Sequence, residues 1–533
     1  MQQFSECVTD NHGRAKRIPA LPRAAARDHV DSPAPLISTP PPTPTSTSIP
    51  TSITSFEDCP DEDPKNWPLS KKLYILCFTL LSVMNSGVSS SLPSNAVPYI
   101  FENFNIDDES QSSLPTSVFL LGYVVGPLIW SPLSETIGRR PVLVYTFIVF
   151  FLSTLACALA PNWPSLLFFR FVCGCMGASP QTVIGGVYAD IFEARARGRV
   201  MAFYMASASF GPILGPIISG FASQHGWRWT FWADLIFAAV ALSGLLFIPE
   251  TFGPVLLKRQ AAKLSKLSGK EITVSLSTID TDLSTIFLRP LYMLLFEPII
   301  LATSIYVAVV YALVFFFFQA YPIIFPEAYN FSIQTTSLTL IPLGIGACAS
   351  GPIAIYWDLK YDSALSKGKS WAFPYSPEMH RLPTSCVSSI TIVASLFWLA
   401  WTATPSVHWI VPTLSGLFFG FGYQIIFTSL LTYVTDAYKV YSASALASSV
   451  ILRSILGAAL PVAAKPMYAS LGVGWSTSLV GFVSLLCVPI PYVLLWKGAW
   501  LREKSRFCQM LVKDEWGQNG SSGSVEGQQR EEC

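Results

Sequence analysis

The segment 298-PIILATSIYVAVVYALVFFFFQAYPIIF-325 contains no charged residue. It exceeds the roughly 20 apolar residues with which a helix crosses a lipid bilayer. Similar segments recur about twelve times between Leu73 and Trp496. The composition agrees, because 51% of the residues are hydrophobic, 13% are charged and the mean hydropathy is +0.46. The sequence therefore predicts an all-α, polytopic membrane protein with twelve transmembrane helices.

Basic residues in the connections predict the direction of these spans. Lys and Arg cluster in every second connection, and among the remaining connections only Arg228 is basic. Since positive loops stay in the cytosol, we expect both termini to be cytosolic. The spans are expected at residues 73–97, 113–133, 141–160, 165–190, 200–223, 229–249, 297–325, 333–357, 385–404, 409–434, 442–468 and 475–497.

The long basic connection that follows Glu250 divides the chain into two six-helix halves. The halves share small patterns: Gly126-Pro127 precedes Glu135, and Gly351-Pro352 precedes Asp358. Such echoes indicate an internal duplication, as in transporters built from repeats. The Pro-, Ser- and Thr-rich start cannot bury enough apolar surface to fold. We expect a disordered cytosolic tail at 1–70, six-helix bundles at 71–250 and 292–500, a cytosolic loop at 251–291 and a cytosolic tail at 501–533.

Three segments contain residues with a mechanical or chemical use. The turn from Ser131 to Arg140 holds Glu135, Gly138 and Arg139, whose charges can pair in one conformation and separate in another. The alternative is a basic turn that only sets topology. Arg170 lies inside the fourth span, where insertion costs about 2.5–3.5 kcal/mol, so it should face the interior or water. The alternative is that its side chain reaches back to the outer interface.

The third segment, Gly211-Pro-Ile-Leu-Gly215-Pro-Ile-Ile-Ser219-Gly220, lies in the fifth span. Glycines four residues apart share one helix face and permit a close neighbour, and the prolines bend the helix. The alternative is a kinked span without a special role.

These three segments resemble motifs A, B and C of the major facilitator superfamily. Ser131 and Glu135 stand where motif A has Gly and Asp, and Ser219 replaces a Gly of motif C, the antiporter motif of drug exporters. Further matches, such as Gly226-Trp-Arg-Trp229 and Pro249-Glu250-Thr251, resemble the fungal twelve-spanner drug:proton antiporters. The resemblance covers about Asn66 to Leu501.

The resemblance implies the major facilitator fold and alternating-access export of hydrophobic or amphipathic small organic molecules, such as drugs, toxins or secondary metabolites, by proton antiport. Asp190, Asp234 and Glu297 are candidate proton carriers, all near span ends. The implied coupling and gating residues are Arg170, Glu135, Arg139, Arg140, Asp190 and Arg197. The implied helix-packing residues are Gly211, Pro212, Gly215, Pro216 and Gly220.

Polar and aromatic residues at mid-span are the candidates for a substrate pocket. A pocket with an aromatic lining and few polar groups suits hydrophobic organic substrates. The alternative is that these side chains only pack or face lipid. The candidates are Asn85, Gln181, Tyr204, Tyr306, Tyr311, Tyr423 and Gln424.

Other classes of function find less support. The net charge of +1 gives no sign of a nucleic-acid partner, and the dispersed His and Cys predict no metal site and no cofactor. The spans contain no catalytic constellation, so we do not expect an enzyme. Uptake of a small nutrient, facilitated or proton-coupled, and a non-transporting receptor or scaffold remain as alternatives. We expect a monomeric plasma-membrane protein whose partners are substrate, protons and the lipid bilayer, with Asn330 of the sequon Asn330-Phe-Ser332 outside and glycosylated.

Overall fold

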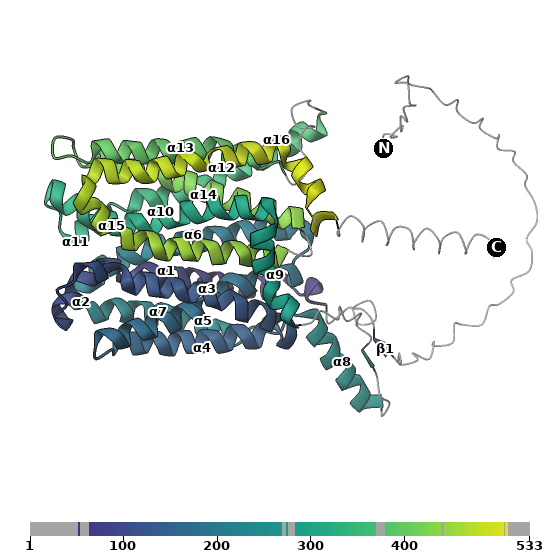
Figure 1. Ribbon diagram of the computed structural model, residues 1–533. Helices are drawn as coiled ribbons and strands as arrows, with labels where there is room; N and C mark the ends of the chain where they lie inside the picture. The colour runs from purple at the N-terminus through teal and green to yellow at the C-terminus, as the bar shows by residue number, and fades with distance from the viewer. Residues whose placement is uncertain are drawn as a thin grey trace, which may run out of the picture. The chain divides into compact units, whose positions relative to one another are not determined.

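The computed structural model describes residues 52–53, 63–268, 273–274, 283–368, 379–438, 442–505 and 507–509. The predicted tails therefore lie mostly outside the described residues. All described helices belong to the unit Pro50–Cys533, and the long ones run side by side (Figure 1). One short parallel pairing joins β1 (Ser52–Ile53) to β2 (Thr273–Val274).

The helices follow the predicted spans closely. The segment before the central loop contains α1 (Leu69–Ser91), α2 (Val97–Phe104), α3 (Leu114–Ile137), α4 (Arg139–Ala158), α5 (Trp163–Ile191), α6 (Ala194–Ala222) and α7 (Trp227–Leu245). The central loop contains α8 (Gly253–Ser268) and leads into α9 (Leu283–Phe296). The remainder contains α10 (Pro298–Tyr329), α11 (Ile333–Leu338), α12 (Ile341–Ser366), α13 (Leu382–Thr402), α14 (Ile410–Tyr438), α15 (Ser442–Cys487) and α16 (Pro489–Lys504).

Ten helical stretches of the described residues are long and apolar enough to cross a membrane. The last, Ser444–Lys504, has 61 residues and contains two crossings, because the chain turns at Gly472, where φ is 72°. The helix α7 is absent from the ten, and its charged Arg228 and Asp234 lower its hydropathy. It nevertheless packs lengthwise against α1 and α4. Counting both arms of the last stretch and α7 gives the twelve expected helices.

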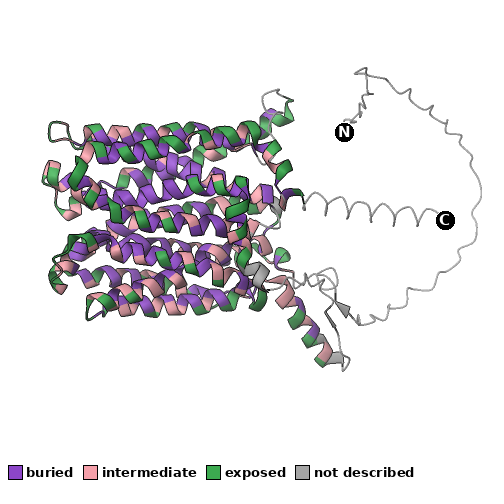
Figure 2. Ribbon diagram, viewed as in Figure 1, coloured by how far each residue is buried: buried purple, intermediate pink, exposed green. Residues whose placement is uncertain are grey.

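Burial follows the pattern of a membrane protein. Buried side chains fill the interior between the helices, and exposed ones cover the outer faces (Figure 2). Many exposed side chains are large and apolar, including Phe247, Leu486 and Trp496. Such a surface is unfavourable in water and compatible with lipid, because every helix satisfies its own backbone hydrogen bonds. The chain is a multi-pass membrane protein.

The two ends of the helix bundle differ in charge. One end, at the right in Figure 1, carries α8, α9 and the turns before α4 and α6. Arg139, Arg140, Arg197, Arg199 and Lys258 lie there, and we call it the basic end. The other end carries α2 and α11 and is called the opposite end. Lys465, which the sequence placed inside the span 442–468, also lies at this opposite end and pairs with Glu109 at 3.3 Å.

The predicted packing glycines of α6 lie against α1. A Cβ added at Gly211 would lie 2.6 Å from the carbonyl oxygen of Met84 and 2.9 Å from the Cα of Gly87. One added at Gly215 would overlap the Ser91 hydroxyl and lie 2.6 Å from the Val88 carbonyl oxygen. The two backbones can approach this closely only because both positions lack a side chain.

This contact predicts opposite effects for two identical substitutions. Gly215→Ala should lower the melting temperature of the purified protein, because relieving the overlap with the α1 backbone costs about 1–3 kcal/mol. Gly198→Ala is the matched control in the same helix, where an added Cβ meets nothing within 4 Å. It should leave the melting temperature unchanged or raise it, because Ala favours a helix over Gly by about 1 kcal/mol. Equal melting temperatures for both variants would contradict the close packing of α1 on α6.

Candidate functional site

A cavity of about 840 Å³ lies between helices from both halves of the sequence. Glu135, Arg197 and Asp436 line it at the basic end, and it extends from there toward the middle of the helices. Its wall combines apolar and polar side chains. They come mainly from α5, α6, α14 and α15, and they include Gln181, Met201, Tyr204, Met205, Ala208, Phe427, Leu431, Ser442, Leu446, Val450 and Arg453.

Four of these residues lie at one depth and form what we call the cavity floor: Gln181, Tyr204, Phe427 and Arg453. Each is ten or eleven residues from the basic end of its helix, which corresponds to about 15–17 Å at 1.5 Å per residue. The helices that carry these residues are about 44 Å long and overhang a bilayer core of roughly 30 Å. The cavity floor therefore lies well inside the membrane, and each half of the chain contributes two floor residues.

The opposite end is closed by contacts between the two halves. Asn95, which follows α1, donates hydrogen bonds to the Pro216 carbonyl oxygen at 2.9 Å and to Ser337 Oγ of α11 at 2.8 Å. Gly220 lies so close to Ser337 that a Cβ there would overlap its side chain. The motif containing Gly211 and Gly220 thus packs on α1 at one point and on the second half at the other. The structure is open at the basic end and closed at the opposite end.

The predicted gating residues of the basic end meet in one charge network. Arg139 Nη1 lies 3.7 Å from Glu135 Oε1, and Arg139 Nε lies 3.5 Å from Asp190 Oδ2. Arg140 instead donates to the Leu246 carbonyl oxygen. Arg197 is exposed at the cavity mouth. The structure therefore joins Glu135, Arg139 and Asp190 directly, within the first half alone.

Glu250 completes this network and was missed as a functional residue. Its side chain is 3% exposed and accepts hydrogen bonds from the backbone N–H groups of Arg139 at 2.9 Å and Arg140 at 3.3 Å. These are the first N–H groups of α4, which have no partner within the helix, and a carboxylate is stabilised there by the helix dipole. Gly138 has a φ of 110° and its hydrogen faces the carboxylate, so any side chain there would collide with Glu250.

Arg170 is 1% exposed and does not reach the outer interface, so that alternative is wrong. Its guanidinium donates to the carbonyl oxygens of Pro115 at 3.0 Å and Ser89 at 2.8 Å and stacks over Phe119 at 4.4 Å. The partners come from α1 and α3, so the arginine is held by neighbouring helices.

Asp234 lies beside this arginine in α7. It is 1% exposed, whereas the sequence placed it near a span end. The two side chains form no salt bridge in the described structure, but both bind groups of α1 within about one helical turn of each other. Asn85 Nδ2 donates to Asp234 Oδ1 at 2.8 Å, and Asp234 Oδ2 has no hydrogen-bond partner among the described residues. The interior of the first half thus contains a buried acid near a buried base. The third carrier candidate, Glu297, instead accepts a hydrogen bond from Tyr438 at 3.0 Å.

Only two of the seven predicted pocket residues, Gln181 and Tyr204, line the cavity. The other five are buried elsewhere. Asn85 binds Asp234, as described above. Tyr306 is packed inside the second half. Tyr423 stacks on Phe419, Gln424 donates to Thr428 of its own helix, and Tyr311 lies under Arg453. Mid-span position alone did not identify the side chains that face the cavity.

Arg453, which with Gly457 and Pro461 also resembles the fungal drug:proton antiporters, carries a second signal in the sequence. Like Arg170, it is a charged residue well inside an apolar span, and the same insertion cost applies to it. Phe427 carried no such signal, because nothing separates it from the many other phenylalanines of the spans.

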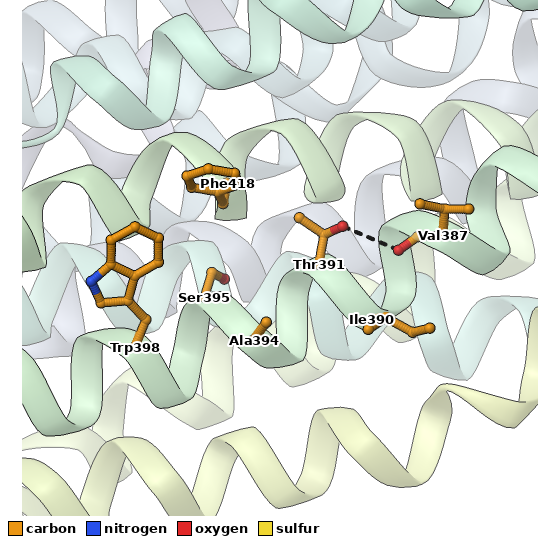
Figure 3. A pocket seen from close by; sticks show the side chains of 7 residues that line it. All are labelled: Val387, Ile390, Thr391, Ala394, Ser395, Trp398 and Phe418. Carbon is orange, nitrogen blue, oxygen red and sulfur yellow. Dashed lines mark hydrogen bonds between the residues drawn. The ribbon is translucent and has the colours of Figure 1, made fainter.

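A second hollow faces away from the bundle interior. This groove of about 400 Å³ lies on α13 and α14 and is lined by Val387, Ile390, Thr391, Ala394, Ser395, Trp398 and Phe418 (Figure 3). Thr391 donates to the Val387 carbonyl oxygen within its own helix, and Val387 and Ile390 are exposed. The groove has an apolar lining and sits on the surface that lipid covers, so it offers no chemistry for a functional site.

The comparisons with known proteins agree with this architecture. A family model described as Major Facilitator Superfamily matches residues 79–461. The chain is 36% identical over 469 residues to the "Major facilitator superfamily multidrug transporter mdrA" of Aspergillus fumigatus, covering 85% of this chain and 76% of that one. It is 36% identical over 461 residues to the "Ascochitine biosynthesis cluster MFS transporter" of Didymella fabae, covering 84% and 88%.

A solved structure also matches. The xylose transporter XylE from E. coli, in a partially occluded inward open conformation, aligns with a TM-score of 0.57 over 80% of this chain and 98% of that one. The sequence identity of 18% makes this a likeness of fold alone.

The position of Glu250 predicts a local effect of its substitution. Glu250→Gln replaces charge-assisted hydrogen bonds, worth about 1.5–3 kcal/mol, by weaker ones and turns an NH₂ group toward N–H donors. Amide hydrogen exchange at Arg139 and Arg140 should accelerate at least about tenfold, because the start of α4 opens more often. Glu193→Gln is the control, since Glu193 is exposed and makes no side-chain hydrogen bond to the start of α6. Unchanged exchange in Glu250→Gln would show that Glu250 does not cap α4.

Proposed function

The chain belongs to the major facilitator superfamily, and we propose that it is a secondary active transporter that exports hydrophobic or amphipathic organic molecules. The cavity carries this proposal: it reaches deep into the membrane from one end while the other end is closed. Both halves line it, so a relative movement of two six-helix bundles, 71–250 and 292–500, would expose its floor to the other side. The relatives named as a multidrug transporter and as a transporter of a biosynthesis cluster favour export of drugs or secondary metabolites.

We propose that the basic end faces the cytosol and that the protein resides in the plasma membrane. The concentration of Lys and Arg at that end supports this direction. Substrate would then enter the open cavity from the cytosol. Asn330 lies exposed at the opposite end, between α10 and α11, where a glycan would be attached outside the cell.

We further propose that export is driven by inward proton flow through Asp234 and Arg170. A buried carboxylate near a buried guanidinium can take up a proton, because a charged acid without a direct ion-pair partner is costly to keep in an apolar interior. The unpartnered Oδ2 of Asp234 offers a place for that proton. Asn85 would hold the carboxylate in either state.

Glu135, Arg139 and Asp190 form the cytosolic gate in this proposal. In the open state their contacts stay within the first half, while Ser442 at the start of α15 lies across the same cavity. When the cavity closes at the basic end, Glu135 would approach α15 and be stabilised near its N-terminus. The gate would then favour the outward-open state.

The proposal predicts a separation between transport and its coupling. A substrate for the assay is identified by deleting the gene and analysing which compounds accumulate in the cells. In proteoliposomes, Asp234→Asn should keep exchange of labelled for unlabelled substrate, because the neutral side chain still binds Asn85. The substrate accumulation that a pH gradient drives should fall at least about tenfold in this variant, since coupling needs a titratable group.

The exposed acid Asp362 on α12 provides the control. Asp362→Asn should support both exchange and gradient-driven accumulation at normal rates. Gradient-driven accumulation by Asp234→Asn at the normal rate would exclude Asp234 as the coupling group. Loss of exchange as well, with normal thermal stability, would mean that Asp234 serves translocation rather than coupling.

A further inference from the structure

We infer that the exported molecule carries a carboxylate or a comparable organic anion, and that Arg453 binds this group at the cavity floor. The inference rests on the proposed function, since it specifies the chemistry of the substrate that the cavity exports.

Arg453 is a buried cation that lines a cavity. Arg453 is 4% exposed and lies in α15, well inside the membrane-spanning part of the helix. A charge at this depth is costly unless partners or water stabilise it. Retaining it between α14 and α10 therefore requires a compensating interaction.

Among the described residues, the guanidinium of Arg453 makes no hydrogen bond and no ion pair, and its Nε atom is buried without a partner. Its contacts are with aromatic rings: Tyr311 of α10 and Phe427 of α14 each lie 5.1 Å from its central carbon. Aromatic rings attract a guanidinium through its charge but accept no conventional hydrogen bond from it. Since no described residue accepts a hydrogen bond from Arg453, its N–H donors remain available for an acceptor of the ligand.

Arg170 is also a buried arginine, but unlike Arg453 it has hydrogen-bond acceptors around its guanidinium. Arg170 is as deeply buried, but carbonyl oxygens of Pro115 and Ser89 accept from it and Asp234 interacts with its charge. No equivalent set of acceptors surrounds Arg453 in the described structure.

The acids of the cavity lie too far away to neutralise Arg453. Asp436 follows Phe427 by nine residues on α14, which places it about 13 Å nearer the basic end. Glu135 is at the cavity mouth and contacts Arg139. A ligand anion is therefore the group that can complete the floor. A cationic ligand would be repelled by Arg453, and a neutral one would leave its donors unsatisfied, which is the more costly outcome in a desolvated site.

The rest of the floor fits an amphipathic anion. Gln181 Oε1 is buried without a hydrogen-bond partner and can accept from a hydroxyl or amide of the ligand. Tyr204, Phe427 and Met205 present apolar surface beside it. A cavity of about 840 Å³ is of the size that binds drug-sized organic molecules. The expected ligand has one anionic group at Arg453 and an aromatic or aliphatic body along this surface.

Ligand pairs that differ in charge alone test this inference. Binding of benzoate, 1-naphthoate and 4-(1-pyrenyl)butyrate, each beside its neutral amide, is measured by calorimetry on the purified full-length protein in lipid nanodiscs without a gradient. At least one carboxylate should bind more tightly than its amide. Arg453→Gln should weaken that carboxylate by at least about tenfold, because a charge-assisted bidentate contact is lost, and change the amide little.

Two further variants make the result specific. Arg453→Lys should keep part of the preference for the carboxylate, because it retains the charge but not the planar fork of donors. Lys497→Gln removes an exposed positive charge on α16 and should leave all affinities unchanged. Melting temperatures show whether each variant is folded.

Three results would overturn the inference: no carboxylate binds, carboxylate and amide bind equally to the unaltered protein, or Arg453→Gln weakens both equally while remaining folded. Because binding is measured without transport, the two proposals fail separately. Carboxylate selectivity without export in vesicles would reject the export function alone, and export of neutral amides without carboxylate selectivity would reject the anion site alone.

Discussion

The cost of holding a guanidinium inside a membrane protein organises this structure. Each half of the chain places one arginine at membrane depth, and the two arginines are stabilised in different ways. Arg170 is surrounded by carbonyl oxygens and an acid of its own half. Arg453 lines a cavity and rests on aromatic rings. The first arrangement is suited to exchanging an internal charge for a proton, and the second to receiving a charge from outside.

The helix packing makes both arrangements available. Gly211 and Gly215 let α6 lie directly on α1, the helix that carries both Asn85 and Ser89. The partners of Arg170 and Asp234 therefore lie in a tight interior and have little freedom. Helix α6 continues to Gly220, where it contacts Ser337 of the other half. One helix therefore links the interior of the first half to the closure of the opposite end. Toward the basic end α6 lines the open cavity instead, through Tyr204 and Met205.

More of the fold than of the candidate site could be predicted from the sequence. Spans follow from hydropathy and charge, which are local, and the turn at Gly472 fell between two predicted spans. Which way a side chain points depends on the neighbouring helices and not on the nearby sequence. Because these helices are apolar on all sides, periodicity does not reveal which side of α10 or α14 meets the cavity. For this reason Tyr306 and Tyr423, predicted for the pocket, are packed away from the cavity, whereas Tyr204 lines it. Glu250 caps a helix that begins 111 residues earlier, and no local pattern indicates such a partner. Arg453 could have been found from its insertion cost alone.

The central claim is that the cavity is open at one end at a time. It is tested by spin-label distances across each end, in a background without reactive cysteines. One pair joins exposed positions 193 and 367 at the basic end, and the other joins positions 107 and 406 at the opposite end. The account predicts that a change of pH or added substrate redistributes two populations, in which the distance at one end shortens as the other lengthens. Distances that change in the same direction at both ends, or a single unchanging population under all conditions, would contradict it.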